Sequence, residues 1–471
     1  RTSTRTISLF FKTKIGDGGN RLGRFPEQYN LDGWFPMPAP FRDGKWMVVP
    51  YDDEAELVGD FYDFDVSFSY PRGLTCIAPG RYGSDTAASV ITDHFRLSPA
   101  HDFVLLLGTG FKRKDYSTNG IRIPFYYRTR NDEAVDSTAR SVLFTLNWMA
   151  EHVGPYPFDE LVIAQTSIGF SGGIEFPQMY WQSSVSTGEY LRFSREVAIH
   201  ETLHQWFYGF LASNQAEDPF LDESITEYFS ERISDAETNR DASLLDAFGF
   251  AARSESYSRM MGHDFLDKLS ITRSALAYSR REYTPVIYGK GAMIMRTITR
   301  LMGDKGDDFW KSFYQQFLFK HPTQRDFVAL ANQFAPFDAK QNVEVVLNSA
   351  SALDYRVDEI KSEELADSGQ VRSTVRFTAQ HPLPFPVVVR LEFPTDPTFD
   401  TTVIATPGEQ QIELTRSQPV TVVTIDPNYQ FAIDVNYLNN SLSRNSHGAA
   451  FRLFSGITFL VESLFTIVGG I

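Results

Sequence analysis

Two histidines, two glutamates and their spacing point to metal-assisted hydrolysis. Residues 200–204 read His-Glu-Thr-Leu-His, and Glu223 follows further along the chain. If this segment is helical, His200 and His204 lie one turn apart on one face, where both imidazoles reach one cation. Glu201 then lies beside the cation, placed to take a proton from a metal-bound water. Glu223 would complete a ligand set of two imidazoles and one carboxylate, which leaves a fourth position open.

The residues around this motif predict the two helices that would bring the ligands together. Ser194 is a suitable N-cap for a helix that runs through the motif. An apolar stripe would bury this helix and consists of Leu203, Trp206, Phe207 and Phe210. The polar stretch 212–218 is short, so a second helix that begins after Pro219 returns beside the first and carries Glu223 towards the histidines.

The pentapeptide alone is weak evidence. A chain with nine histidines contains it by chance in roughly one case in a hundred. Two further blocks strengthen it: Gly-Gly-Ile-Glu-Phe-Pro at 172–177 and Tyr-Gly-Lys-Gly at 288–291. With these blocks in this order, the chain resembles the M1 family of zinc aminopeptidases, gluzincins related to aminopeptidase N and leukotriene A4 hydrolase. The resemblance is close over about 150–300 and looser to about 436.

The resemblance implies roles for the residues around the metal. His200, His204 and Glu223 match the zinc ligands of the family, which implies one bound Zn²⁺ ion. Glu201 matches the general base. Glu231 lies about two turns beyond Glu223 on the same expected helix, where it would either support a zinc-bound histidine from the second shell or face solvent.

The resemblance also implies how a substrate would be held. Glu175 matches the glutamate that binds the free α-amino group of a peptide, and the neighbouring backbone of Gly172 and Gly173 allows close approach. Tyr288 matches the tyrosine that donates a hydrogen bond to the oxyanion. The implied activity is hydrolysis of the N-terminal peptide bond.

The chain departs from the family pattern at two positions in these blocks. Asp222 precedes the third ligand, where many members have asparagine, and adds charge near the metal. Ile174 replaces the methionine of the glycine block, and this apolar exchange should mainly alter the shape of the pocket. None of the reacting groups is missing.

The expected fold class is a multidomain α+β protein. The expected parts are an N-terminal β-rich domain at 1–131, a thermolysin-like catalytic domain at 132–340, a β-sandwich at 341–436, and a linker with an amphipathic or apolar tail at 437–471. Helices are predicted at 138–152, 244–261, 291–302, 308–319 and 324–334. Strands are predicted at 65–70, 103–107, 161–165, 371–378, 387–393, 402–405 and 420–425. The glycine block is predicted to be an edge strand, against which an extended peptide could pair.

The tail at 449–471 is apolar but interrupted by Arg452 and Glu462, which leaves no uncharged run long enough for a membrane span. Its apolar residues fall on one side at helical periodicity. It is therefore predicted to be an amphipathic helix that lies on a membrane surface or packs on the protein or another subunit.

Composition limits the partners and leaves the compartment open. The 471 residues carry a formal charge of −15, which argues against nucleic acid as a partner and favours cationic peptide ends. Cys76 is the single cysteine, so an internal disulfide is excluded. An extracytoplasmic or membrane-associated location and a cytoplasmic one both remain consistent with the sequence.

Two other classes of function compete with the aminopeptidase. One is an endopeptidase or epoxide hydrolase that uses the same metal site. The other is a non-catalytic peptide-binding or membrane-associated module on a gluzincin scaffold. The presence of Glu201 and Tyr288 beside a full ligand set argues against the non-catalytic alternative.

Overall fold

The structure is a computed structural model that describes residues 6–444 with short gaps. The gaps are residues 20, 43, 51–56, 184–188, 239–244, 248–249, 253, 336–338, 349, 351–352, 367 and 382–383. The chain divides into two compact units. The first consists of Arg1–Ser254, Arg273–Ser279 and Asp307–Phe327, and the second of Glu255–Thr272, Arg280–Gly306 and Val328–Ile471.

A five-stranded sheet forms the centre of the first unit, in the order β10-β11-β12-β14-β13. Its strands are β10 Lys112–Thr118, β11 Ile121–Tyr127, β12 Val162–Gln165, β13 Gly173–Phe176 and β14 Met179–Gln182. The three inner strands are parallel, and β10 and β13 run antiparallel at the two edges. The glycine block is thus an edge strand, as predicted. β12 is buried along its whole length, which is typical of parallel strands covered on both faces.

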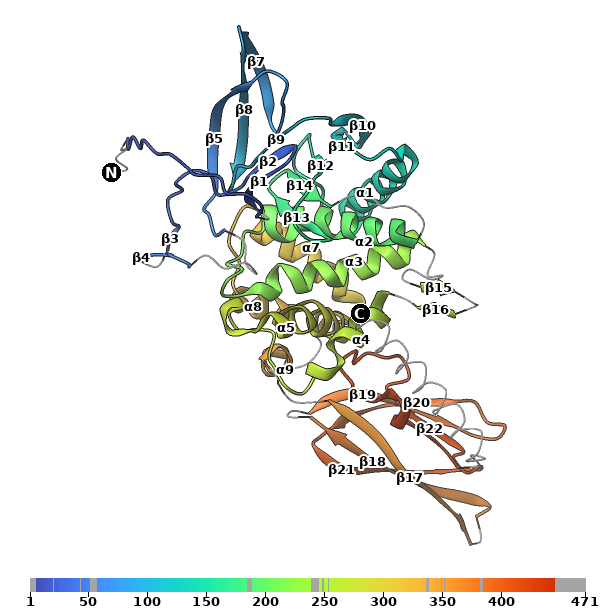
Figure 1. Cartoon of the computed structure of the whole chain (residues 1–471). Helices are drawn as coiled ribbons and strands as arrows, with labels where there is room; N and C mark the ends of the chain where they lie inside the picture. The colour runs from blue at the N-terminus through green and yellow to red at the C-terminus, as the bar shows by residue number, and fades with distance from the viewer. Residues whose placement is uncertain are drawn as a thin grey trace. The chain divides into compact units, whose positions relative to one another are not determined.

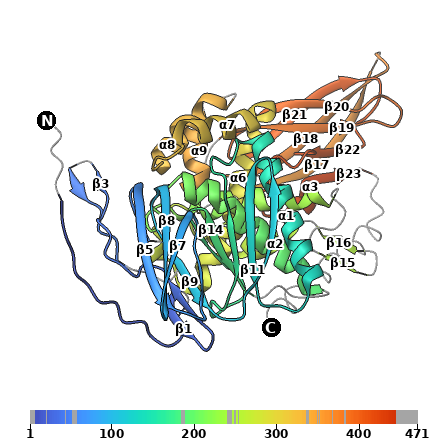
Figure 2. The same ribbon diagram turned by 90° about the horizontal axis from the view of Figure 1, so that it is seen from above.

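The N-terminal part of this unit is also rich in strands (Figure 2). A four-stranded sheet has the order β1-β2-β9-β6, with β1 Leu22–Phe25, β2 Gln28–Leu31, β9 Leu105–Gly108 and β6 Thr75–Ile77. A three-stranded sheet has the order β5-β8-β7, with β5 Tyr62–Pro71, β8 Val90–Ala100 and β7 Arg81–Ala87. Two hairpins pair β3 Phe41–Arg42 with β4 Lys45–Trp46, and β15 Leu245–Ala247 with β16 Phe250–Ala252. The strands predicted at 65–70 and 103–107 overlap β5 and β9.

Helices α1, α2 and α3 run beside one another next to the five-stranded sheet (Figure 1). The helical segments of this unit are α1 Asp132–His152, α2 Glu189–His204, the π-helix η1 Gln205–Phe210, the 3-10 turns η2 Pro219–Leu221 and η4 Ala275–Ala277, α3 Glu223–Glu237 and α7 Gly306–Phe317. α1 begins where the Asn131 side chain accepts a hydrogen bond from the Ala134 amide at 3.1 Å. The apolar stripe predicted after the motif is fully buried.

Two predictions about helix boundaries are wrong. Ser194 does not cap the motif helix, because α2 already begins at Glu189 and Ser194 lies buried inside it. Among the described residues of the helix predicted at 244–261, the helical ones belong to α4 Ser254–Gly262, and the strands β15 and β16 precede it. Apolar periodicity over a short segment does not separate a helix from a small hairpin.

The second unit has a helical part and two antiparallel sheets. Its helical segments are α4, η3 His263–Phe265, α5 Arg280–Tyr283, the π-helix η5 Thr284–Lys290, α6 Gly291–Leu301, η6 Gly303–Lys305, α9 Ala339–Asn348 and η7 Tyr437–Asn439. α8 Gln324–Phe334 has its first turn in the first unit and the rest in the second. The helices predicted at 291–302, 308–319 and 324–334 correspond to α6, α7 and α8.

The two sheets of this unit contact one another through β17, β22 and β23. One has the order β17-β18-β21, with β17 Asp354–Leu365, β18 Gln370–Gln380 and β21 Gly408–Arg416. The other has the order β20-β19-β22-β23, with β20 Phe399–Ala405, β19 Phe385–Glu392, β22 Val422–Ile425 and β23 Ser441–Ser443. Every second residue of β19 is buried, as expected for a strand with one face in a core. The four strands predicted after residue 370 overlap β18, β19, β20 and β22.

The amphipathic tail predicted at 449–471 lies outside the described residues. Within the described part of the chain, none of the helices combines the length and the hydropathy that a bilayer crossing requires.

Candidate active site

Helices α2 and α3 bring the three predicted metal ligands to one point in the first unit. The Nε2 atoms of His200 and His204 lie 2.9 Å apart. Glu223, the first residue of α3, places Oε2 at 3.2 Å from His200 Nε2 and at 3.3 Å from His204 Nε2. The buried loop after η1 reverses the chain, so residues far apart in sequence become neighbours.

The spacing of these three atoms fits a tetrahedral zinc ion. Zinc bonds of about 2.0–2.1 Å in a tetrahedron separate the ligand atoms by roughly 3.3 Å. The two distances to Glu223 match this value, and the distance between the imidazoles is a few tenths of an ångström shorter. Two histidines and one carboxylate are also the donor set of many catalytic zinc sites.

The electrostatics of this cluster favour a positive charge at its centre. Burial by itself would lower the pKa of His200, but the carboxylates of Glu223 and Glu227 raise it to about 10. Burial would likewise raise the pKa of Glu223, but the two imidazoles outweigh burial and lower it. The cluster therefore holds a proton tightly where a cation would bind.

Each imidazole also meets a carboxylate on its other nitrogen. His204 Nδ1 lies 2.6 Å from Asp222 Oδ1, and His200 Nδ1 lies 3.2 Å from Glu227 Oε2. Donation of the Nδ1 proton to a carboxylate leaves the Nε2 lone pair directed at the shared point, which is the tautomer that a metal requires. Sequence reasoning missed Glu227, although it lies one helical turn after Glu223, and treated Asp222 only as added charge.

Glu201 lies buried beside this cluster, with 4% of its surface exposed, and its Oε2 has no hydrogen-bond partner among the described residues. Its side chain packs against the backbone of β13. A β-carbon on Gly173 would come within 2.3 Å of Glu201 Cδ, so a larger residue there would have to displace the Glu201 side chain. Burial, together with the nearby Glu175 carboxylate, raises the pKa of Glu201 to about 8. A divalent cation beside it would lower that pKa again.

The edge strand β13 brings Glu175 to the same region. Glu175 is 5% exposed, and its Oε1 lies 3.9 Å from His204 Nδ1 without a hydrogen bond. Gly172 holds the start of the strand, because its amide donates to Ser183 Oγ at 3.0 Å and its carbonyl accepts from the Ser183 amide at 2.9 Å. A buried carboxylate that lacks a donor is costly unless a ligand supplies one.

Gln205, the residue after His204, ties the motif helix to the turn between β13 and β14. Its Nε2 donates to the Phe176 carbonyl at 2.9 Å, and its Oε1 accepts from the Gln178 amide at 2.8 Å. Gln178 has a left-handed backbone with φ of 61°. These bonds stabilise that turn and link the position of β13 to that of α2. The sequence motifs did not predict a role for Gln205.

Two other predicted residues lie elsewhere. Tyr288 belongs to η5 in the second unit, so its role remains a prediction from the resemblance. Glu231 is buried on α3 with 1% of its surface exposed. The carboxylates that meet the two imidazoles on Nδ1 are Asp222 and Glu227, and a supporting role for Glu231 also remains a prediction.

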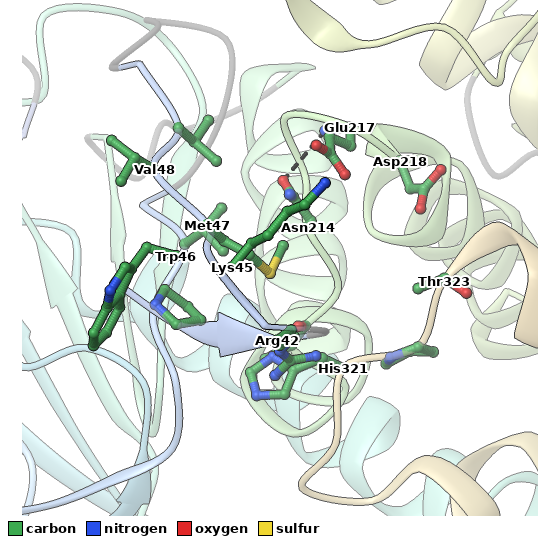
Figure 3. A pocket seen from close by; sticks show the side chains of 15 residues that line it. Arg42, Lys45, Trp46, Met47, Val48, Asn214, Glu217, Asp218, His321 and Thr323 are labelled. Atoms are coloured by element: carbon green, nitrogen blue, oxygen red, sulfur yellow. Dashed lines mark hydrogen bonds between the residues drawn. The ribbon is translucent and has the colours of Figure 1, made fainter. Parts of the chain in front are cut away.

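The first unit also contains a pocket that is separate from these residues (Figure 3). It has a volume of about 490 Å³ and lies between the hairpin of β3 and β4, the loop at 212–218 and residues 321–323. In it the Glu217 amide donates to Asn214 Oδ1 at 3.2 Å. None of the predicted site residues lines this pocket.

The chain is similar to known proteins in sequence and in fold. Residues 177–349 match the family model described as peptidase family M1 domain. The crystal structure of Legionella pneumophila aminopeptidase A in complex with aspartic acid is similar in fold, with a TM-score of 0.61 and 14% sequence identity. The match covers 79% of this chain and 44% of that one, so this chain spans less than half of its length. No curated protein matches the sequence. Residues 177–349 are therefore similar to a peptidase family M1 domain.

Proposed function

We propose that this chain is a zinc-dependent aminopeptidase that hydrolyses the N-terminal bond of peptides with a free amino terminus. The observation that carries this proposal is the triangle of His200 Nε2, His204 Nε2 and Glu223 Oε2, with sides of 2.9–3.3 Å. The family domain and the fold shared with an aminopeptidase support the same reaction class. A zinc ion held there would act as a Lewis acid and lower the pKa of a bound water.

Glu201 would move the proton in this reaction. It accepts a proton from the attacking water and delivers it to the leaving amine. Its burial and its free Oε2 support this role, because a carboxylate kept buried without a partner has no structural benefit. The same observation disfavours a non-catalytic scaffold.

Glu175 would bind the protonated amino terminus through its unpaired Oε1. A carboxylate at this position limits cleavage to the first residue, which favours an aminopeptidase over an endopeptidase. The substrate backbone would pair with the edge strand β13 in an extended form. Tyr288 would donate a hydrogen bond to the oxyanion, on the strength of the family resemblance.

A panel of aminoacyl fluorogenic substrates with acetylated counterparts tests this proposal. Free substrates should be hydrolysed much faster than acetylated ones, and a chelator should abolish activity until zinc is restored. Glu201→Gln should lose turnover but keep zinc, which separates the general base from the metal site. Folded protein without bound zinc, or turnover retained in Glu201→Gln, would overturn the assignment.

A further inference from the structure

Tyr288 lies in a π-helical part of the second unit. The helices α5, η5 and α6 form one continuous helical run from Arg280 to Leu301, and the middle seven residues are a π-helix. π-helices are rare, and single-turn π-bulges inside α-helices are found frequently at functional sites.

Two glycines bring η5 against the end of α4. A β-carbon on Gly289 would lie 2.6 Å from the Gly262 amide nitrogen, and one on Gly262 would lie 2.4 Å from the Lys290 amide nitrogen. The two backbones are therefore in direct contact, with no space for a side chain between them. This contact sets the distance between η5 and the last residue of α4.

Lys290 links η5 to residues 265–269 through hydrogen bonds. It is 2% exposed, and its ammonium donates to the carbonyls of Phe265, Leu266 and Leu269 at 3.3, 2.9 and 2.6 Å. Phe265 is the last residue of η3, and its carbonyl also accepts a hydrogen bond from the Lys268 amide at 3.2 Å. Leu266 lies in the turn that follows η3, and Leu269 comes directly after that turn. The three N–H donors of the ammonium can thus each meet one of them.

We propose that Lys290 is a positioning residue for Tyr288: its ammonium anchors the π-helical segment to residues 265–269 and so fixes where the Tyr288 hydroxyl points. This inference rests on the role proposed for Tyr288 above. Burial lowers the pKa of Lys290 to about 8, partly offset by Asp267, so the side chain still carries its three donors at neutral pH.

A double-mutant cycle tests this inference. Tyr288→Phe should reduce kcat by about 10²- to 10³-fold, as the loss of an oxyanion donor does. Lys290→Met should reduce kcat by about 10- to 100-fold, because a small displacement of a reacting group is sufficient for such a loss, with KM and bound zinc unchanged. The double variant should be no slower than Tyr288→Phe alone, since Lys290 acts through Tyr288.

Losses that multiply in the double variant would overturn the role of Lys290 while leaving the proposed function intact. Full kcat in Tyr288→Phe would overturn the role of Tyr288 and this inference with it. If Lys290→Met does not fold, the same cycle is run with Lys290→Arg, whose planar guanidinium keeps the charge but cannot meet all three carbonyls from one nitrogen. Lys268→Met is the matched control on the same loop, because Lys268 is exposed, and it should retain full kcat.

Discussion

Gly173 of β13 lies directly against the side chain of Glu201 in α2, close enough that a β-carbon would approach Glu201 Cδ to 2.3 Å. Residues from two different elements thus determine where the carboxylate lies. Glycine suits position 173 because the Glu201 side chain occupies the space of a β-carbon. The backbone conformation of Gly173 itself is ordinary.

Gly173→Ala should therefore displace the Glu201 carboxylate and reduce kcat by about 100-fold, while bound zinc is retained. Steady-state kinetics together with elemental analysis would check this. Gly16→Ala is a matched control, because a β-carbon there would meet nothing within 4 Å. Wild-type kcat in Gly173→Ala would show that Glu201 is not positioned by this contact.

Asp222→Asn should weaken zinc binding by about 10- to 100-fold, because it removes the carboxylate on His204 Nδ1. Competition with a chelator measures the affinity without any substrate. Glu227→Gln should also weaken zinc binding, because it removes the carboxylate next to His200 Nδ1. Glu217→Gln removes an equal charge from an exposed side chain in the loop before α3 and should leave the affinity unchanged.

Glu175→Gln should reduce kcat/KM for substrates with a free amino terminus by about 10- to 100-fold. A hydrogen bond to a charged group contributes about 1.5–3 kcal/mol, which corresponds to such a factor. The residual rate on acetylated substrates should not fall. An unchanged ratio between free and acetylated substrates would rule out this role for Glu175.

His101 should make the free energy of unfolding depend on pH. It is buried, and its Nε2 lies 3.1 Å from the Tyr208 carbonyl in η1. Burial, with a contribution from His321, lowers the pKa of His101 to about 3. The unfolded chain binds a proton below pH ~6.5 that the folded protein does not, so stability should decrease as the pH falls from ~6.5 towards 3.

At pH 5 the loss from this residue should be ~2 kcal/mol relative to pH 7. His101→Gln should lose correspondingly less between these two values in urea denaturation. The metal ligands are present in both proteins, so their contribution cancels in the comparison. An equal loss in both proteins would contradict the prediction.

Much of the fold followed from local patterns. The long periodic segments at 138–152 and 324–334 form α1 and α8, because helical periodicity over three or more turns is a strong signal. The error at Ser194 has a different origin. A good capping residue is also tolerated inside a helix when tertiary packing buries it, so its type alone does not mark where a helix starts.

The sequence by itself determined that His200 and His204 share one helix face, because the spacing of one turn fixes their separation wherever that helix lies. It also predicted the resemblance to the M1 family, and residues 177–349 match the family model described as peptidase family M1 domain. Only the tertiary structure decided that Glu227 and Asp222 meet the imidazoles, that Gly173 packs against Glu201, and that Lys290 caps the turn at 265–269. These contacts join segments distant in sequence, and their geometry depends on how whole helices and strands pack, which no local pattern encodes.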